Sequence, residues 1–417
     1  MVNLLKVTDI HRITPSGDVG KRQFVKTKVV PFLIRVLNSS SPNPISGRSI
    51  LRDELSSMKD ALTELDKEAR ELGLISSRKG FFLTLQSCLD QSVSRNEGIP
   101  TYKDVLWKAR NLALRGELLE SVLELRSSLQ GTGVYVSADF YGRLTYATGG
   151  DVIAELEYSC LGHTNTALLL MPFSRDTFYW DAGGYYNTSA DEILINADGI
   201  QVKPGEDIQK YQESVGKMKE TMAGLSAGTS RLSTSLVQLG TQLYYQVLAN
   251  LGDKHYETFK DHDDNVVEIR MPLATTTLVH ESWHRIDAGA TGLMARDSSG
   301  EFVDLSTVMV DSAMKEATAM LSPMIYGSDP RLAFSKILTA LTNSRSSHAK
   351  GARIILPYLT EGLVNAGLIE SEASVGSKIS HIAGLDDVQL RTIASFALKR
   401  TYERVEVSLI NEMQPGS

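Results

Sequence analysis

The chain has 417 residues, of which 42% are hydrophobic and 22% charged, so it can bury a large core and has room for two or three folded units. Its formal net charge is −7, from 43 basic and 50 acidic side chains, which argues against a polyanionic partner such as nucleic acid or an anionic membrane. Its two cysteines, Cys88 and Cys160, form no Cys-x-x-Cys pattern, so neither a disulfide framework nor a thiolate zinc cluster is expected.

The amino-terminal residues lack the continuous apolar stretch of a secretory signal peptide. Nowhere does the sequence contain the run of about 18 apolar residues that stable membrane insertion requires. The Ser-rich stretch 39–44 is typical of a linker, and residues 1–48 are expected to be a flexible lead segment. These features predict a protein that is cytoplasmic, or exported without a Sec signal peptide.

Residues 49–130 are predicted to form an N-terminal helical domain. Apolar residues from Leu51 to Leu72 recur at steps of four and three, which is typical of a helix with one narrow apolar face. Two further helical patterns cover about 81–94 and 102–129. The glycines that follow indicate the end of this region.

Residues 134–203 are rich in Gly, Thr, Tyr and Val with short alternating runs, and are predicted to be strand-rich. A second long helical pattern covers 208–247, and the small residues at 224–230 mark where a helical hairpin would turn. The acidic run 261–265 lacks the glycine and glutamate of a calcium loop, so a turn is predicted there. A short strand, Val266–Arg270, follows it, and beyond residue 305 the pattern is helical to the end.

The segment that carries the chemistry has the pattern His-Glu-x-x-His at His280, Glu281 and His284, on a stretch with helical periodicity. Residues four apart lie one turn from each other on one helix face. Both imidazoles can therefore reach one cation at the roughly 2.0–2.1 Å of zinc–nitrogen bonds. Glu281 lies beside this pair and can accept a proton from an attacking water. The pattern predicts a Zn2+ site with Glu281 as the general base.

A catalytic zinc ion needs a third protein ligand and one open position. No histidine follows within the ten residues after His284, so a downstream carboxylate is the natural candidate. Glu316 lies at the edge of an apolar helical face, where burying a carboxylate is costly unless a cation receives it. Asp311 is the alternative, although its position near Lys315 also suits a surface ion pair.

The motif His280-Glu281-x-x-His284-x-Ile286-Asp287, followed by Glu316-Ala317-x-Ala319 and Tyr326-Gly327-Ser328-Asp329, resembles gluzincin metallopeptidases of the anthrax lethal-factor-like kind. The resemblance covers about residues 190–345. It implies a zinc-dependent endopeptidase that acts on a protein or peptide substrate, in a secreted effector or toxin. It also implies that Asp287 orients a neighbouring group.

For the fold, the resemblance implies an α+β chain with a zincin-like metallopeptidase domain, which is placed at 131–345. The helical pattern beyond it predicts a C-terminal helical region at 346–417. The domain would contain a small sheet with Glu192–Asn196 as its edge strand. Trp283 departs from the family, which often has glycine there. The family's tyrosine between the second histidine and the glutamate is also missing, and Tyr326 is the nearest replacement for its hydroxyl, which would steady the tetrahedral intermediate.

Two other interpretations stay open. Peptide deformylases also use His-Glu-x-x-His, with a cysteine as third ligand, but Cys160 lies 120 residues before His280. The long apolar faces at 51–72 and 208–247 would also suit a helical binding or structural protein with a structural or vestigial zinc site. A structural site would be closed by four protein ligands, whereas a catalytic site keeps one position open. The sequence leaves the oligomeric state open.

Overall fold

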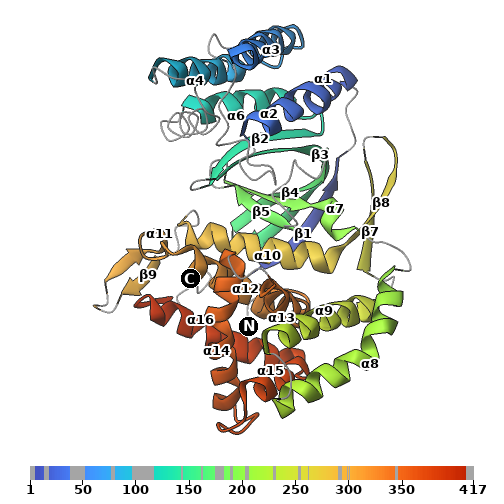
Figure 1. Cartoon of the computed structure of the whole chain (residues 1–417), viewed down its shortest axis with the longest axis vertical. Helices are drawn as coiled ribbons and strands as arrows, with labels where there is room; N and C mark the ends of the chain where they lie inside the picture. Colours follow the sequence, from blue (N-terminus) through green and yellow to red (C-terminus); the bar gives the residue numbers. More distant parts are fainter. Residues whose placement is uncertain are drawn as a thin grey trace.

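The chain has a mixed α+β structure, in which a sheet lies between an upper group of helices from the amino-terminal part and a larger lower group (Figure 1). The structure is a computed structural model. It describes residues 5–13, 18–37, 52–76, 80–95, 117–141, 144–160, 163–173, 183–187, 191–201, 206–228, 232–251, 255–261, 263–289, 294–297, 299, 301–342 and 346–409.

The main sheet has six strands in the order β1-β3-β4-β6-β5, with β2 paired to β3. Only the β4–β6 pair is parallel. The strands are β1 Leu5–Arg12, β2 Val134–Tyr141, β3 Leu144–Cys160, β4 His163–Pro172, β5 Gly184–Asn187 and β6 Glu192–Asn196. The predicted edge strand is therefore wrong, because β6 is an inner strand and the short β5 forms the edge beside it.

The described part of residues 1–48 forms ordered elements in place of the expected flexible lead. β1 pairs with β3, and α1 (Val19–Phe24) continues through a π-helical turn, η1 (Val25–Val29), into α2 (Val30–Leu37). The apolar side chains of α1, η1 and α2 are buried with those of the next helices, and those of β1 pack against the larger core, which is why the segment is held. The Ser-rich stretch 39–44 lies outside the described residues.

Three helices of the predicted N-terminal helical region are described: α3 (Arg52–Glu71), α4 (Phe81–Arg95) and α6 (Glu117–Leu129). The first half of the predicted 102–129 pattern lies outside the described residues. The three helices share one apolar core with α1, α2 and the start of β2. This core is separate from the larger core below the sheet.

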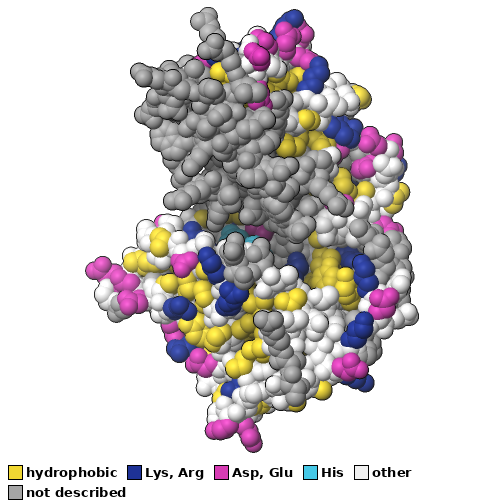
Figure 2. All heavy atoms as spheres, viewed as in Figure 1, with side chains coloured by type: hydrophobic (Ala, Val, Ile, Leu, Met, Phe, Trp, Pro, Cys, Tyr) yellow, Lys and Arg dark blue, Asp and Glu magenta, His cyan; other side chains and the backbone are white. Residues whose placement is uncertain are grey.

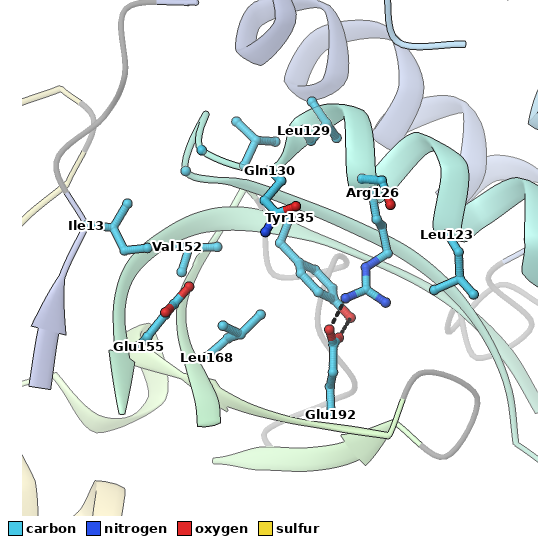
Figure 3. A pocket seen from close by; sticks show the side chains of 14 residues that line it. Ile13, Leu123, Arg126, Leu129, Gln130, Tyr135, Val152, Glu155, Leu168 and Glu192 are labelled. Carbon is cyan, nitrogen blue, oxygen red and sulfur yellow. Dashed lines mark hydrogen bonds and ion pairs between the residues drawn. The ribbon is translucent and has the colours of Figure 1, made fainter. Parts of the chain in front are cut away.

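Arg126 joins α6 to the upper face of the sheet. Its guanidinium lies 4.8 Å from the ring centroid of Tyr135 and donates to Glu192 of β6, which also accepts from the Tyr135 hydroxyl at 3.0 Å (Figure 3). These side chains line a cavity of about 350 Å³ together with apolar side chains such as Leu168. Polar and apolar contacts therefore both connect the helical layer to the sheet.

Arg22 of α1 makes a second connection to the sheet. It donates two hydrogen bonds to the carboxylate of Asp151 in β3, at 2.8 and 2.7 Å, and the two side chains are 13% and 6% exposed. A third hydrogen bond, of 3.3 Å, reaches the more exposed Asp263 in the turn after β7. The guanidinium thus connects three segments that are distant in the sequence.

We expect Asp151→Ala to lower the free energy of unfolding by about 3 kcal/mol, because it leaves a largely buried guanidinium without its main partner. Chemical denaturation followed by circular dichroism measures the change. Lys260→Ala is the control, since it breaks only an exposed pair with Asp264, and we expect no measurable effect. Equal effects of the two variants would show that Arg22 does not depend on Asp151.

The predicted helical pattern at 208–247 is a hairpin of α8 (Glu206–Ala227) and α9 (Leu232–Leu251), and its break falls in the small-residue segment. The acidic run after it closes the hairpin of β7 (Tyr256–Lys260) and β8 (Val266–Arg270). The Asp261 carboxylate accepts from the backbone N–H of Asp263 and of Asn265, at 2.9 and 2.8 Å. This confirms the predicted turn.

The helical pattern beyond residue 305 is confirmed for the described residues up to 404. The expectation of helix to the end is wrong at β11 (Val407–Leu409), whose three residues are too few to show a period in the sequence. β11 pairs with β9 (Met294–Asp297), which also pairs with β10 (Phe302–Asp304). The helices are α11 Leu305–Val308, α12 Ser312–Tyr326, α13 Pro330–Ala340, α14 Ser347–Asn365, α15 Val375–Ala383 and α16 Asp387–Arg404.

One large hydrophobic core contains the lower face of the sheet, α9, the central helix α10 (Met271–Asp287) and the helices from α12 to α16. α10 runs beneath the sheet in Figure 1, and the short α7 (Ala197–Ile200) leads away from β6. No helix in the described ranges is both long and apolar enough to cross a bilayer.

Candidate metal centre

The predicted ligand helix is α10, which starts directly after β8 and carries Pro272 in its first turn, where the fixed φ of proline suits a helix. It ends before Gly289, whose φ of 76° favours glycine. Val279 and Ile286 are fully buried on the core side, and Trp283 nearly so. The opposite side of the helix is thereby left to the histidines.

Arg285, next to the second histidine, fixes α10 to the sheet. It donates to both carboxylate oxygens of Asp191, at 2.7 and 2.8 Å, and to the side chain of Asn165 in β4 at 2.6 Å. The hydroxyl of Tyr186 in β5 also donates to Asp191, at 2.9 Å. These hydrogen bonds fix the position of α10 relative to β4 and β5 of the sheet.

The structure brings together the three predicted ligands. His280 Nε2 lies 3.2 Å from His284 Nε2, and Glu316 Oε2 of α12 lies 3.6 Å from each of them. The three side chains are 16%, 18% and 12% exposed. Histidine and acidic side chains reach the surface together near the middle of the face in Figure 2, at the height of α10 in Figure 1.

Asp311, the alternative third ligand, has a different position. It is the N-cap of α12, where its carboxylate accepts from the backbone N–H of Ala313 at 2.7 Å. A capping carboxylate satisfies one of the free N–H groups at the start of a helix. The structure therefore gives Glu316, rather than Asp311, the position beside the two imidazoles.

A fourth group, His348 of α14, was missed by the sequence analysis. Its Nε2 lies 3.3 Å from Glu316 Oε2, and its ring stacks on that of His280 with centroids 5.9 Å apart and 8° between the planes. His280, Glu316 and His348 offer ligand atoms that all lie within 4.8 Å of one another, so this group could hold a metal ion. A single histidine 64 residues after His284 carries no local signal that would have revealed it.

Gly351 accounts for the position of His348, one turn before it on α14. A Cβ at Gly351 would lie 2.9 Å from the backbone nitrogen of Ala317 and 2.9 Å from the Cβ of Glu316. Only glycine leaves room for α14 to approach α12 this closely. Ser347 uses the same approach to donate a hydrogen bond of 3.2 Å to Glu316 Oε1.

Two overlapping sets of three groups fit the edges of a tetrahedral cation site: His280, His284 and Glu316, and His280, Glu316 and His348. Two ligand atoms at roughly 2.0–2.1 Å from one ion lie about 3.3–3.4 Å apart in that geometry. The measured separations are 3.2, 3.3, 3.6 and 3.6 Å. Glu316 Oε2 is buried and has no hydrogen-bond partner among the described residues. An unpaired buried carboxylate oxygen is costly, and a cation between these side chains would remove that cost.

The pKa values of the candidate ligands are shifted even without a bound ion. Burial acts to raise the pKa of Glu316, but the charge of His284 and the contact with His280 hold it well below its usual range. Burial lowers the pKa of His280 to about 4, whereas the attraction of Glu316 outweighs burial at His284 and raises its pKa to about 9. Without metal, His284 therefore carries the positive charge that Glu316 requires, and a bound cation would replace that proton.

Glu281, the predicted base, is buried beside this group. Burial raises its pKa to about 7, although the charge of His284 and the backbone N–H of Tyr186 in β5 act to lower it. Lys336 of α13 lies nearby, with burial lowering its pKa to about 8 and the charge of Glu281 opposing that shift. Lys336 Nζ donates at 3.4 Å to Thr277, one turn before Glu281. No sequence pattern indicates this lysine.

Asp287 is fully buried at the end of α10 and joins three helices. It accepts hydrogen bonds from Thr318 of α12 and, at 2.8 Å, from Tyr402 of α16, whose hydroxyl accepts from Trp283 Nε1 at 2.9 Å. Burial raises the pKa of Asp287 to about 6. The network fixes α10 against α12, and with it the spacing between the histidines and Glu316.

Tyr326 lies at the last residue of α12. Its ring stacks on Trp283, with centroids 5.3 Å apart and 19° between the planes. This contact gives Tyr326 and the unusual Trp283 a shared packing role next to the Asp287 network. The part expected of the Tyr326 hydroxyl in catalysis stays a prediction.

We expect Gly351→Ala to lower the free energy of unfolding by about 1–3 kcal/mol and to weaken the binding of any metal ion at this site, because the added methyl group pushes α14 away from Glu316. Thermal unfolding and a chelator competition measure the two effects. Gly20→Ala on α1 is the control, since its Cβ would meet only ordinary contacts at 3.7 Å. Unchanged zinc affinity in Gly351→Ala would contradict the role given to this helix contact.

Comparison with protein-family models, curated proteins and solved structures finds no match for this chain. The gluzincin resemblance therefore rests on the motifs alone. The function has to be argued from the chemistry of the site.

Proposed function

We propose that the chain is a zinc-dependent peptidase of the gluzincin type, in which His280, His284 and Glu316 hold the ion and Glu281 is the general base. One observation carries the proposal. The buried carboxyl group of Glu281 lies next to a cluster of two imidazoles and the Glu316 carboxylate. The distances between the two imidazole nitrogens, and from each of them to Glu316 Oε2, match the edges of a tetrahedral site. The zincin-like fold, with α10 below a small sheet and Glu316 on α12, belongs to the same proposal.

The donor set favours zinc. Imidazole nitrogen suits zinc, copper, iron and nickel, and carboxylate oxygen suits harder ions. Two histidines and one glutamate are a known ligand set for hydrolytic zinc, which tolerates mixed nitrogen and oxygen donors. The absence of cysteine from the group also fits a catalytic site better than a zinc-finger site.

When bound, zinc supplies Lewis acidity, which polarises a substrate carbonyl and lowers the pKa of water towards about 7. The other steps belong to Glu281. Its carboxylate takes a proton from the attacking water as the water oxygen bonds to the carbonyl carbon, and returns that proton to the nitrogen as the carbon–nitrogen bond breaks. A carboxyl group whose pKa is raised towards 7 suits both transfers near neutral pH.

A structural zinc site is the second candidate, and His348 is the observation that favours it. His348 approaches Glu316 Oε2 at 3.3 Å and so adds a fourth candidate ligand, and four is the ligand number of a structural site. Glu281 favours the catalytic assignment, because a structural site has no use for a buried carboxyl group beside its ligands. The expected export as an effector or toxin stays a prediction.

We expect Glu281→Gln to retain one zinc per chain but to cleave peptides at least about 100-fold more slowly, because the amide cannot accept a proton. Mass spectrometry of a mixed peptide library measures cleavage, and elemental analysis measures zinc. Glu361→Gln on α14 is the control, since that residue only pairs with Arg400 at the surface. Cleavage by Glu281→Gln at the wild-type rate would rule out its role as the base.

We expect Glu316→Ala to lose stoichiometric zinc, because Glu316 Oε2 lies within 3.6 Å of an imidazole nitrogen of His280, His284 and His348, and the substitution removes this shared, negatively charged ligand. Asp311→Asn keeps the helix cap and should retain one zinc per chain. Elemental analysis of the two purified variants decides between the candidate carboxylates. Zinc retained in Glu316→Ala and lost in Asp311→Asn would reverse the assignment.

A further inference from the structure

His348 differs from the other three groups in its exposure. Its side chain is 47% exposed, whereas those of His280, His284 and Glu316 are 12–18% exposed. Across the described part of the chain, its ring makes no hydrogen bond; its Nε2 lies 3.3 Å from Glu316, and its ring stacks on His280. His348 is therefore the one group of the four whose side chain can leave without unpacking a core.

The backbone that carries His348 is held firmly. Ser346 caps α14 by accepting from the N–H of Ala349 at 3.1 Å, and Ser347 donates to Glu316. The close contact at Gly351 keeps this first turn against α12. Movement of His348 is thus confined to rotation of its side chain, which needs no shift of the helix.

A catalytic zinc site requires one position for water or substrate, and four protein ligands would occupy all positions of a tetrahedral ion. The three buried groups come from the interiors of α10 and α12, whose other sides lie in the core. His348 comes from the first turn of α14, at the surface. Closing and opening the site can therefore be assigned to this one side chain.

We propose that His348 is a displaceable fourth ligand, which closes the metal centre in the resting protein and swings away to admit water or substrate. This inference rests on the proposed function, because it requires the metal to sit between His280, His284 and Glu316. It names the regulation of that site. The site is inactive while the His348 imidazole is bound and competent when the imidazole points to solvent.

The first test measures zinc affinity of the full-length protein by chelator competition. We expect His348→Ala to bind one zinc with a dissociation constant raised roughly 10- to 100-fold, as for an auxiliary group of a metal site. His284→Ala should lose stoichiometric binding. His381→Ala, an exposed histidine on α15, is the matched control and should bind as the wild type does.

The second test uses cobalt(II) in place of zinc and records visible absorption while free imidazole is added. In His348→Ala we expect imidazole to enter the open position and restore the wild-type spectrum. In the wild type the tethered His348 competes at an effective concentration in the millimolar range, so imidazole should act at least about tenfold more weakly. Coordination geometry is visible in these spectra independently of any peptidase activity.

The outcomes separate the two proposals. Unchanged zinc affinity and cobalt spectrum in His348→Ala, with binding lost in His284→Ala, would overturn the role of His348 and leave the peptidase proposal standing. Loss of stoichiometric zinc in His348→Ala would make this residue a permanent ligand and also overturn its displacement. Zinc retained in both variants would refute the metal centre itself, and with it the proposed function.

Discussion

The contact between the buried Glu316 carboxylate and the imidazoles around it is the interaction on which the site depends. A carboxylate that is 12% exposed, with one oxygen lacking a hydrogen-bond partner among the described residues, is stable only if positive charge lies beside it. His284 supplies that charge without metal, and zinc would supply more of it. The same carboxylate brings α10, α12 and α14 to one point, so the helical packing and the chemistry share one constraint.

Two further features keep that point fixed. Asp287 receives hydrogen bonds from α12 and α16, and this sets how far α10 can slide or turn. The edge strand β5 lies close to the other side of α10. Its first residue, Gly184, has to be glycine, because a Cβ there would lie 2.7 Å from a methyl group of Thr277 on α10. Glu281 is buried on α10 between these neighbours. The position of the site residues therefore depends on close packing between helices and the sheet edge rather than on loops.

Local periodicity was enough to predict His280, Glu281 and His284, because their relation lies within two helical turns of one segment. Glu316 could also be predicted, since a glutamate on an apolar helical face is unusual without a cation. His348 and Lys336 could not be predicted. They reach the site through the packing of α14 and α13, and sequence spacing contains no information about that packing. The edge strand was misassigned for a related reason, since β5 has only four residues. The described residues of the 1–48 segment form ordered elements that the sequence did not suggest, because β1 is stabilised by pairing with β3, more than 140 residues away.

The central claim is that one zinc ion lies between α10 and α12, and anomalous diffraction at the zinc edge from crystals of the zinc-loaded protein tests it most directly. We expect a single anomalous peak within about 2.2 Å of His280 Nε2, His284 Nε2 and a carboxylate oxygen of Glu316. A peak elsewhere in the chain, or none between these three side chains, would contradict it.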